Sequence, residues 1–183
     1  MAGGYQSLIV YQQAVLIFDL NAEFCVKFLD PFKDKRTIEQ MTQASRSGKQ
    51  NIVEGSLEKS SKMNIKLSGV SRGSFGELLE DYKDFLRIRK LEIWKKDDAR
   101  LLPIRKMRVE GDLSNSSNLA NWSNWTSDPE RFANLMITLI SKENYLLDNM
   151  IRSLENKFVK EGGYSENLFK RRMGERNKTN WTN

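Results

Sequence analysis

The stretch QASRSGKQNIVEGS, from Gln43 to Ser56, decides the fold because it places small residues inside an otherwise helical segment. Each glycine weakens a helix by about 1 kcal/mol relative to alanine, yet no proline interrupts the stretch. Helical spacing puts Ser45, Gly48 and Gly55 on one stripe with Met41 and Ile52. These small residues predict a place where a neighbouring helix packs closely.

The segment that follows repeats this pattern. Gly69, Gly73 and Gly76 recur at steps of four and three residues in a helix predicted over about 61–91. Two successive helices with glycine stripes favour a close antiparallel hairpin, with axes nearer than the usual distance of about 8–10 Å. We therefore predict helix-packing roles for Gly48, Gly55, Gly69, Gly73 and Gly76.

The segment before the hairpin is also helical. Apolar residues at three- and four-residue steps predict a first helix at about 5–29. A capping box that opens at Thr37 predicts the second helix at about 37–55. The first helix is apolar around much of its circumference, which predicts an exposed apolar patch and hence a homo-oligomer.

The second half of the chain is predicted to contain one long helix. Asp128 as N-cap and Pro129 at the first helical position begin it, and glycines at 162 and 163 end it, giving a helix at about 129–160. The segment from about residue 92 to about residue 128 is predicted to form an irregular insertion. Its candidate anchors are Trp94, Leu101, Leu102, Ile104, Met107, Trp122 and Trp125.

Together these patterns predict an all-α fold, an antiparallel up-down four-helix bundle with a C-terminal extension. The bundle domain covers residues 1–160, and residues 161–183 form a basic C-terminal tail with at most one short helix. No strand pattern of comparable strength occurs.

Composition excludes several kinds of chemistry. The 183 residues include no histidine and a single cysteine, so histidine catalysis, histidine metal ligation and a disulfide within the chain are excluded. Cys25 lies in the apolar run LNAEFCVKFL, which predicts a buried thiol. We predict no catalytic, cofactor-binding or metal site.

The N-terminal segment lacks the pattern of a signal peptide, because polar residues such as Gln12 and Asp19 interrupt it. No stretch reads as long and apolar enough to span a membrane. The expectation is a cytoplasmic protein without a membrane partner.

Positive charge is concentrated in two places. The net charge is +6, with nine Lys or Arg against four acids over residues 87–110 and five against one over 170–178. A basic surface can contact phosphates, whereas a solvated helix end and a polar tail are the alternatives. The candidate contacts to nucleic acid are Arg87, Arg89, Lys90, Lys95, Lys96, Lys170, Arg171 and Arg172. Nearby Trp94, Tyr164 and Trp181 offer rings for base stacking.

Asn51 and Glu54 form the polar part of the opening stretch. One interpretation makes Glu54 a catalytic acid or metal ligand, but bundle metal sites combine glutamate with histidine. A second places the two residues in a subunit contact. The interpretation we favour is a polar register pair that bonds across the hairpin, to Arg46 or Arg72.

Three segments together carry a family resemblance: YQQAVLIFDL, SRSGKQNIVEGS and RGSFGELLEDYKDFLRIRKL. They resemble the four-helix-bundle family that includes proteins encoded in intervening sequences of 23S ribosomal RNA genes (23S rRNA intervening sequence protein-like), and within it the four-helix-bundle suffix-domain branch. Residues 51–55 and the Gly73-Ser74…Glu77-Leu78 segment carry most of the resemblance. The insertion and the basic tail are additional to the short members.

The resemblance implies the same bundle fold. A related accessory protein of diversity-generating retroelements is a ring of five such bundles, which works with a reverse transcriptase and nucleic acid. The resemblance therefore implies a pentamer and a nucleic acid or nucleic-acid enzyme as partner. Our hypothesis is a non-enzymatic oligomeric helix-bundle scaffold or adaptor that contacts RNA or DNA through basic surfaces. The alternative is a protein-only assembly module with no nucleic-acid role.

Overall fold

A computed structural model describes residues 4–106 and 124–179 of the chain. All regular structure in these residues is helical, which confirms the predicted all-α class. The elements are η1 (Tyr5–Ser7), α1 (Ile9–Phe28), α2 (Lys35–Leu57), α3 (Ser61–Ile88), η2 (Ala99–Leu101), α4 (Leu102–Lys106), α6 (Pro129–Glu161) and α7 (Tyr164–Thr179).

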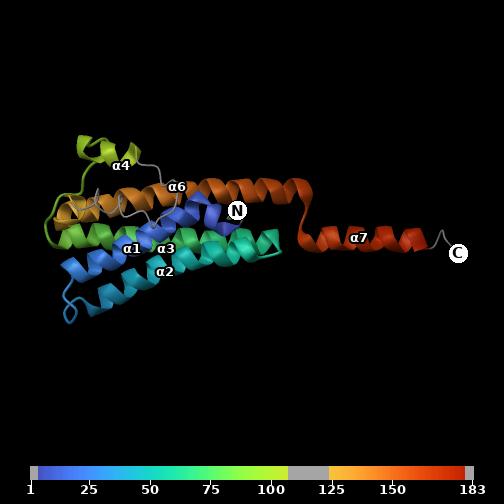
Figure 1. Cartoon of the computed structure of the whole chain (residues 1–183), viewed down its shortest axis with the longest axis horizontal. Coiled ribbons are helices and arrows are strands. Elements are labelled where there is room, and N and C mark those ends of the chain that lie inside the picture. The colour runs from blue at the N-terminus through green and yellow to red at the C-terminus, as the bar shows by residue number, and fades with distance from the viewer. Residues whose placement is uncertain (1–3, 107–123, 180–183) are drawn as a thin grey trace.

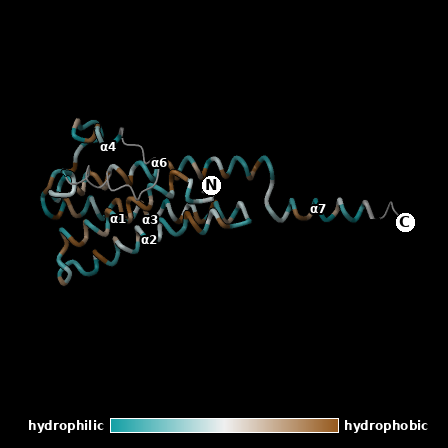
Figure 2. Tube along the Cα trace, viewed as in Figure 1, coloured by the Kyte–Doolittle hydropathy of each residue, from teal (hydrophilic) through white to brown (hydrophobic). Residues whose placement is uncertain are grey.

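Four long helices form what we call the helical body: α1, α2, α3 and α6. Helix α2 packs against α3, α3 packs against α6, and α1 contacts both α2 and α6 (Figure 1). Hydrophobic and hydrophilic residues alternate along each of these helices, as expected of helices with one buried face (Figure 2). Helix α7 extends beyond the helical body along its long axis (Figure 1).

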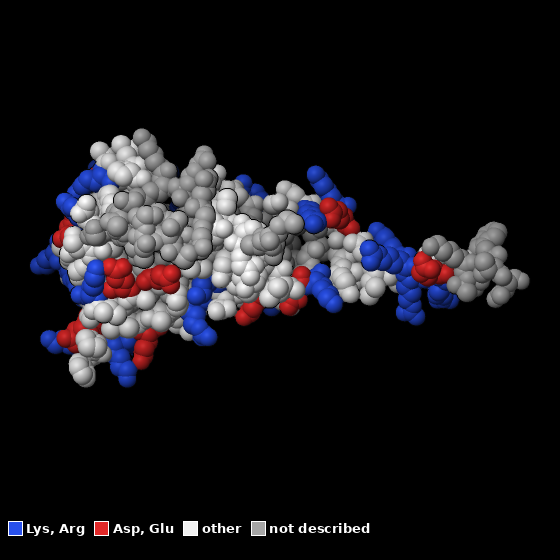
Figure 3. Space-filling model, in the orientation of Figure 1, with Lys and Arg blue, Asp and Glu red and all other residues white. Residues whose placement is uncertain are grey.

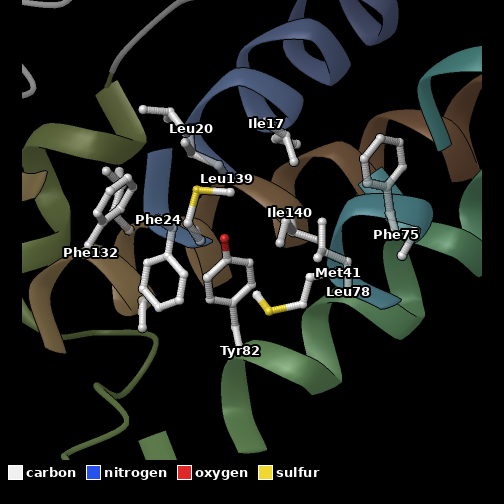
Figure 4. Packing of buried hydrophobic residues seen from close by; sticks show 14 of the residues in the cluster. Ile17, Leu20, Phe24, Met41, Phe75, Leu78, Tyr82, Phe132, Leu139 and Ile140 are labelled. Atoms are coloured by element: carbon white, nitrogen blue, oxygen red, sulfur yellow. The ribbon is translucent and has the colours of Figure 1, made fainter. Parts of the chain in front are cut away.

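The core of the helical body is aromatic at its centre. Phe24 of α1 makes edge-on contacts with Tyr82, Phe85 and Phe132, at ring-centroid distances of 4.8, 4.8 and 5.3 Å. Figure 4 shows Phe24, Tyr82 and Phe132 reaching this centre from α1, α3 and α6. Full burial of side chains this large stabilises a fold by about 1.5–3 kcal/mol each.

Buried polar groups join the helices at defined positions. The Tyr82 hydroxyl donates to Asn21 Oδ1 at 2.8 Å, and Asn21 Nδ2 donates to the Met41 carbonyl and to Ser45 Oγ, both at 3.2 Å. This network links α3, α1 and α2. Because each partner would otherwise be left without a hydrogen bond in the core, the network disfavours sliding of one helix along another.

Gly48 explains the small residues of the opening stretch. A Cβ at Gly48 would lie 2.6 Å from Phe75 Cε2, and one at Gly55 would lie 3.4 Å from the Asn64 carbonyl oxygen. Beside Gly48, Ser71 Oγ of α3 donates to the Gly48 carbonyl at 2.8 Å. The two glycines of α2 therefore lie at the contact with α3, as predicted.

The glycines of α3 face elsewhere, and the prediction that they pack within this hairpin is wrong. A Cβ would meet nothing within 4 Å at Gly69 or Gly73, and only the Arg72 guanidinium at Gly76. The larger apolar residues of α3 occupy the buried face instead, because they gain more free energy there than a glycine does. These residues are Phe75, Leu78, Tyr82, Phe85 and Leu86.

Several helix ends follow the expected local chemistry. The Asp128 carboxylate accepts from Arg131 N at 2.8 Å with Pro129 behind it, and Gly162 ends α6 in the left-handed region at φ 76°. Helix α2, however, begins at Lys35 rather than after Thr37. Asp30 and Asp34 bond the backbone of the turn between them, so the helix starts directly after that turn.

Helix α1 corrects two predictions. It is long and apolar enough by composition to cross a membrane, although Ala14, Ile17 and Phe24 are buried in the helical body and buried core helices pass the same test. Its apolar surface is also mostly covered. Ile9 and Val26 are exposed, but Val10 and Ile17 are buried and Tyr11, Leu16 and Phe18 are partly buried. The predicted broad apolar patch on this helix is therefore absent from the described residues.

Candidate functional site

A groove of about 750 Å³ runs between α2 and α3 on the surface of the helical body. Its floor consists of small side chains, Ala44, Ser47, Ser74 and Gly76. Four carboxylates line it, Glu39 from α2 and Glu77, Glu80 and Asp81 from α3, together with Gln40 and Gln43. We call this feature the acidic groove.

The groove concentrates negative charge. Partial burial raises the pKa of Asp81, and the nearby carboxylates of Asp84 and Glu77 raise it further. Some of the charge is locally balanced, since Lys83 bonds Glu80 at 2.7 Å. The sequence shows the acidic run of α3 but not that Glu39 of α2 faces it, so the groove was not predicted.

The basic residues at the end of α3 are partly committed to ion pairs. Arg87 pairs with Asp84 at 2.9 Å, and Arg89 pairs with Asp34 at 3.4 Å while its guanidinium lies over the Phe85 ring. These interactions stabilise the end of the helix. Arg87 and Arg89 are therefore weaker candidates for a phosphate contact than the sequence indicates.

Lys90 has an unusual backbone. Its φ is 57°, and no other non-glycine residue in the described part of the chain has a positive φ. It follows the C-cap of α3, where Leu91 N bonds back to the Leu86 carbonyl at 2.9 Å, and glycine is favoured at such positions. The side chain of Lys90 is exposed and makes no ion pair with the described residues.

The start of the predicted insertion is fixed to α6 through Asn134. Asn134 Oδ1 accepts from Trp94 N at 2.8 Å, and its Nδ2 donates to the Glu92 carbonyl at 2.8 Å. Trp94 itself is buried and donates from Nε1 to Glu130 at 3.1 Å. Trp94 is thus an anchor, as predicted, and not a ring on which a base can stack.

Other predicted anchors had mixed outcomes. Leu101 and Ile104 are buried and Trp125 packs edge-on against Trp94, but Leu102 is half exposed. Met107, Trp122 and Trp181 lie outside the described residues. The anchored segment keeps Lys95, Lys96 and Arg105 at the surface, where they make no ion pair with the described residues.

The tail is a helix over a much longer range than predicted. In α7 all side chains from Tyr164 to Asn177 are exposed. Lys170, Arg171, Arg172 and Arg176 make this helix basic, and Figure 3 shows positive side chains along it. Tyr164 is half exposed, so of the two predicted stacking rings that the structure describes it is the one that remains available.

The structure separates the predicted nucleic-acid contacts into two groups. Arg87, Arg89, Lys90, Lys95 and Lys96 lie at one end of the helical body, near α4. Lys170, Arg171 and Arg172 lie on α7, which extends from the opposite end (Figure 1). One copy of the chain therefore does not bring them into a single surface.

Asn51 and Glu54 do not form the predicted register pair. Asn51 Nδ2 donates to the carbonyl and the hydroxyl of Ser47 on its own helix, at 2.8 and 3.2 Å. Glu54 is exposed, and Arg72 pairs with Asp148 of α6 instead. The bonds across the α2–α3 contact come from serines, such as Ser71 to Gly48, because short side chains reach where the backbones are close.

Three buried polar residues were missed. Glu143 has no exposed surface, and neither of its carboxylate oxygens has a hydrogen-bond partner within the described part of the chain. The side-chain oxygens of Gln13 and Asn144 are also buried without such a partner there. Burial raises the pKa of Glu143 well above its ordinary value, opposed by the charge of Lys142. The signal was present in the sequence, since Glu143 lies one turn from Leu139 and one turn from Leu147 on the apolar stripe of α6.

No group of three or more acidic, cysteine or histidine residues lies close enough to hold a metal ion in residues 4–106 and 124–179. Cys25 is buried as predicted, and burial raises the pKa of its thiol to about 11. Its nucleophilic thiolate is therefore scarce at neutral pH.

Comparison with known proteins identifies no relative: no protein family, no curated protein and no solved structure matches this chain.

Proposed function

We propose that this chain is a non-enzymatic subunit of an oligomeric scaffold or adaptor, built as an antiparallel up-down four-helix bundle with a C-terminal helical extension. The observation that carries the proposal is α7, a helix of 16 residues whose side chains are exposed from Tyr164 to Asn177. A helix of this length is marginally stable alone in water. Contact with a further molecule supplies the packing that it lacks.

The apolar residues of α7 support assembly. Leu168 and Phe169 are 52% and 64% exposed, and Met173 is 37% exposed. Exposed apolar groups clustered on one short helix are typical of an interface. The resemblance to the ring-forming bundle family supports the same proposal and favours five copies.

Light scattering of the full chain at micromolar concentration tests this function. We expect a mass that is a multiple of the 21.3 kDa monomer. Replacing Leu168 and Phe169 by serine is expected to weaken assembly, whereas Val159→Ser, at an exposed position on α6, is the matched control. A monomer at all concentrations contradicts the proposal.

A second candidate function is contact with RNA or DNA, and Lys90 favours it. A lysine held at a positive φ, where glycine is favoured, suggests that its side chain is retained for a purpose. Lys95, Lys96 and Arg105 add exposed positive charge at the same end of the helical body. Such a surface meets phosphates and reads no base sequence.

Titration of single-stranded RNA and duplex DNA at two salt concentrations tests this candidate. Affinity is expected to fall with salt, with a log–log slope of about −0.7 to −0.9 per phosphate neutralised. Lys90→Gly is expected to weaken binding while stabilising the end of α3 by up to about 1 kcal/mol. Lys59→Gly, at an exposed position in the turn between α2 and α3, is the control for lost charge. Absence of binding at low salt leaves the protein-only scaffold as the better function.

A further inference from the structure

We propose that α7 of one copy docks in the acidic groove of a second copy, with Arg172 and Arg176 facing the carboxylates of the groove. The inference rests on the proposed assembly function and names the two surfaces that meet. It accounts for an exposed basic helix and an open acidic groove on the same chain.

The groove has the shape that a helix needs. Its floor is built from Ala44, Ser47, Ser74 and Gly76, so the backbone of an incoming helix can approach closely. Gly69 and Gly73 continue this face along α3, with open space in front of both. Each of these exposed glycines weakens α3 relative to alanine, and no contact among the described residues of one copy compensates for that loss. A helix packed against them from outside supplies the compensation.

Helix α7 carries a matching face. Leu168, Arg172 and Arg176 follow one another at four-residue steps, and Phe169 and Met173 lie beside them on the helix. At 3.6 residues per turn, Lys170 and Arg171 lie roughly 120–140° around the helix from the midpoint of Arg172 and Arg176. The docking face is therefore mixed apolar and cationic, whereas Lys170 and Arg171 remain on another side.

Charge complementarity selects this pairing. The groove presents Glu39 and Glu77 as exposed carboxylates on opposite walls, and Arg172 and Arg176 are exposed on α7. Guanidinium groups bind carboxylates through two parallel hydrogen bonds, which orient as well as attract. Since acidic groove and basic helix are different surfaces, the contact is head-to-tail and generates a ring or an open chain of copies.

The groove of the same copy is out of reach for Arg172. The ion pair between Arg72 and Asp148 aligns α3 with α6, so that Ser61 and Glu161 lie at the same end of the helical body. From Ser61 to Glu77 is 16 residues, about 24 Å along α3 at 1.5 Å per residue. From Tyr164 to Arg172 is 8 residues, about 12 Å along α7 by the same rise. A helix folded back at Gly162 and Gly163 would leave Arg172 about 12 Å short of Glu77 along the helix axis. The two arginines therefore reach the carboxylates together only on a second copy.

A charge-exchange experiment tests the docking. The helix variant carries Arg172→Glu and Arg176→Glu, and the groove variant carries Glu39→Lys and Glu77→Lys. Sedimentation velocity at tens of micromolar is expected to show each variant alone as a monomer. An equimolar mixture is expected to assemble, because acidic α7 then meets a basic groove and the two native surfaces meet each other. The two variants must alternate in this assembly, so it is expected to contain an even number of copies.

The matched control is Lys170→Glu with Arg171→Glu, the same charge change on another side of α7, which is expected to assemble like the wild type. Circular dichroism checks that every variant stays helical, and all replaced residues are exposed. If the helix variant assembles like the wild type, or if the mixture stays monomeric, this docking is wrong while the scaffold function stands. If the wild type itself is monomeric, both are wrong.

Discussion

Gly48 and Gly73 lie on two helices that touch, yet they differ in what lies in front of them. Phe75 is fully buried and leaves no room for a Cβ at Gly48, whereas the space at Gly73 is open. Gly48→Ala is expected to destabilise the fold by roughly 1–3 kcal/mol through overpacking. Gly73→Ala is expected to stabilise it by up to about 1 kcal/mol, because alanine favours the helix. Urea unfolding at low protein concentration measures both, and shifts of the same sign would contradict this structure of the α2–α3 contact.

Glu143 makes stability depend on pH. Burial raises the pKa of its carboxyl and so favours the protonated form in the folded state, while the unfolded chain releases the proton above the ordinary pKa of about 4.5. The contribution of this residue is therefore fully present below that value and is lost as pH rises toward the raised folded pKa. The Glu143→Gln variant cannot ionise at this position. Its melting temperature is expected to be close to that of the wild type at about pH 4 and higher than that of the wild type at about pH 7.

Thermal melts across that range measure the difference between the two curves. Glu155→Gln on the same helix is the control, since Glu155 is exposed and its replacement leaves the core unchanged. Parallel curves for the wild type and Glu143→Gln would show that the carboxyl is not buried in the folded protein.

At the scale of elements, one side chain attaches the segment after α3 to α6. Asn134 makes hydrogen bonds to Trp94 N and to the carbonyls of Glu92 and Glu130. Asn134→Ala removes the side-chain partner of Trp94 N and of the Glu92 carbonyl and is expected to cost about 1–3 kcal/mol. Denaturant unfolding measures the loss. Asn156→Ala, at an exposed position on the same helix, is expected to change stability little, and equal effects would argue against the attachment.

Helix α7 connects elements to the whole molecule. Gly162 adopts a φ of 76°, and Asn167 Nδ2 donates to the Glu161 carbonyl at 3.2 Å, so the start of α7 is ordered locally. Beyond that start, the side chains of α7 are exposed up to Asn177 in the described part of the chain. We therefore expect the helicity of α7 to depend on contact with a second copy.

For the whole molecule, this dependence predicts that the amides of α7 are protected only in the assembled state. Hydrogen exchange of the wild type is expected to be slow in α7 at tens of micromolar and fast after dilution below the assembly concentration. The amides of α3 and α6 in the core are expected to stay protected at both concentrations. Equal protection of the α7 amides at both protein concentrations would show that α7 stays helical without a second copy.

Local sequence was sufficient to predict the helices and many of their ends. Asp128 with Pro129 before α6 and Gly162 after it act through groups within four residues of themselves, so neighbouring residues alone specify them. The three- and four-residue apolar steps likewise indicate a helix without knowledge of its partner. Cys25 was predicted to be buried for the same reason, since it lies on an apolar run.

Only the tertiary structure decided how each helix is turned about its axis. The glycines of α3 resemble a packing stripe in sequence, but Phe75, Leu78 and Tyr82 gain more by burial and rotate Gly69 and Gly73 to the surface. The orientation of a helix depends on the combined packing of residues far apart in the chain. This orientation also explains why Asn51 bonds its own helix and why Glu39 lines the same groove as the carboxylates of α3. Periodicity therefore specified that these segments are helices, and the shared core determined which residues form the acidic groove.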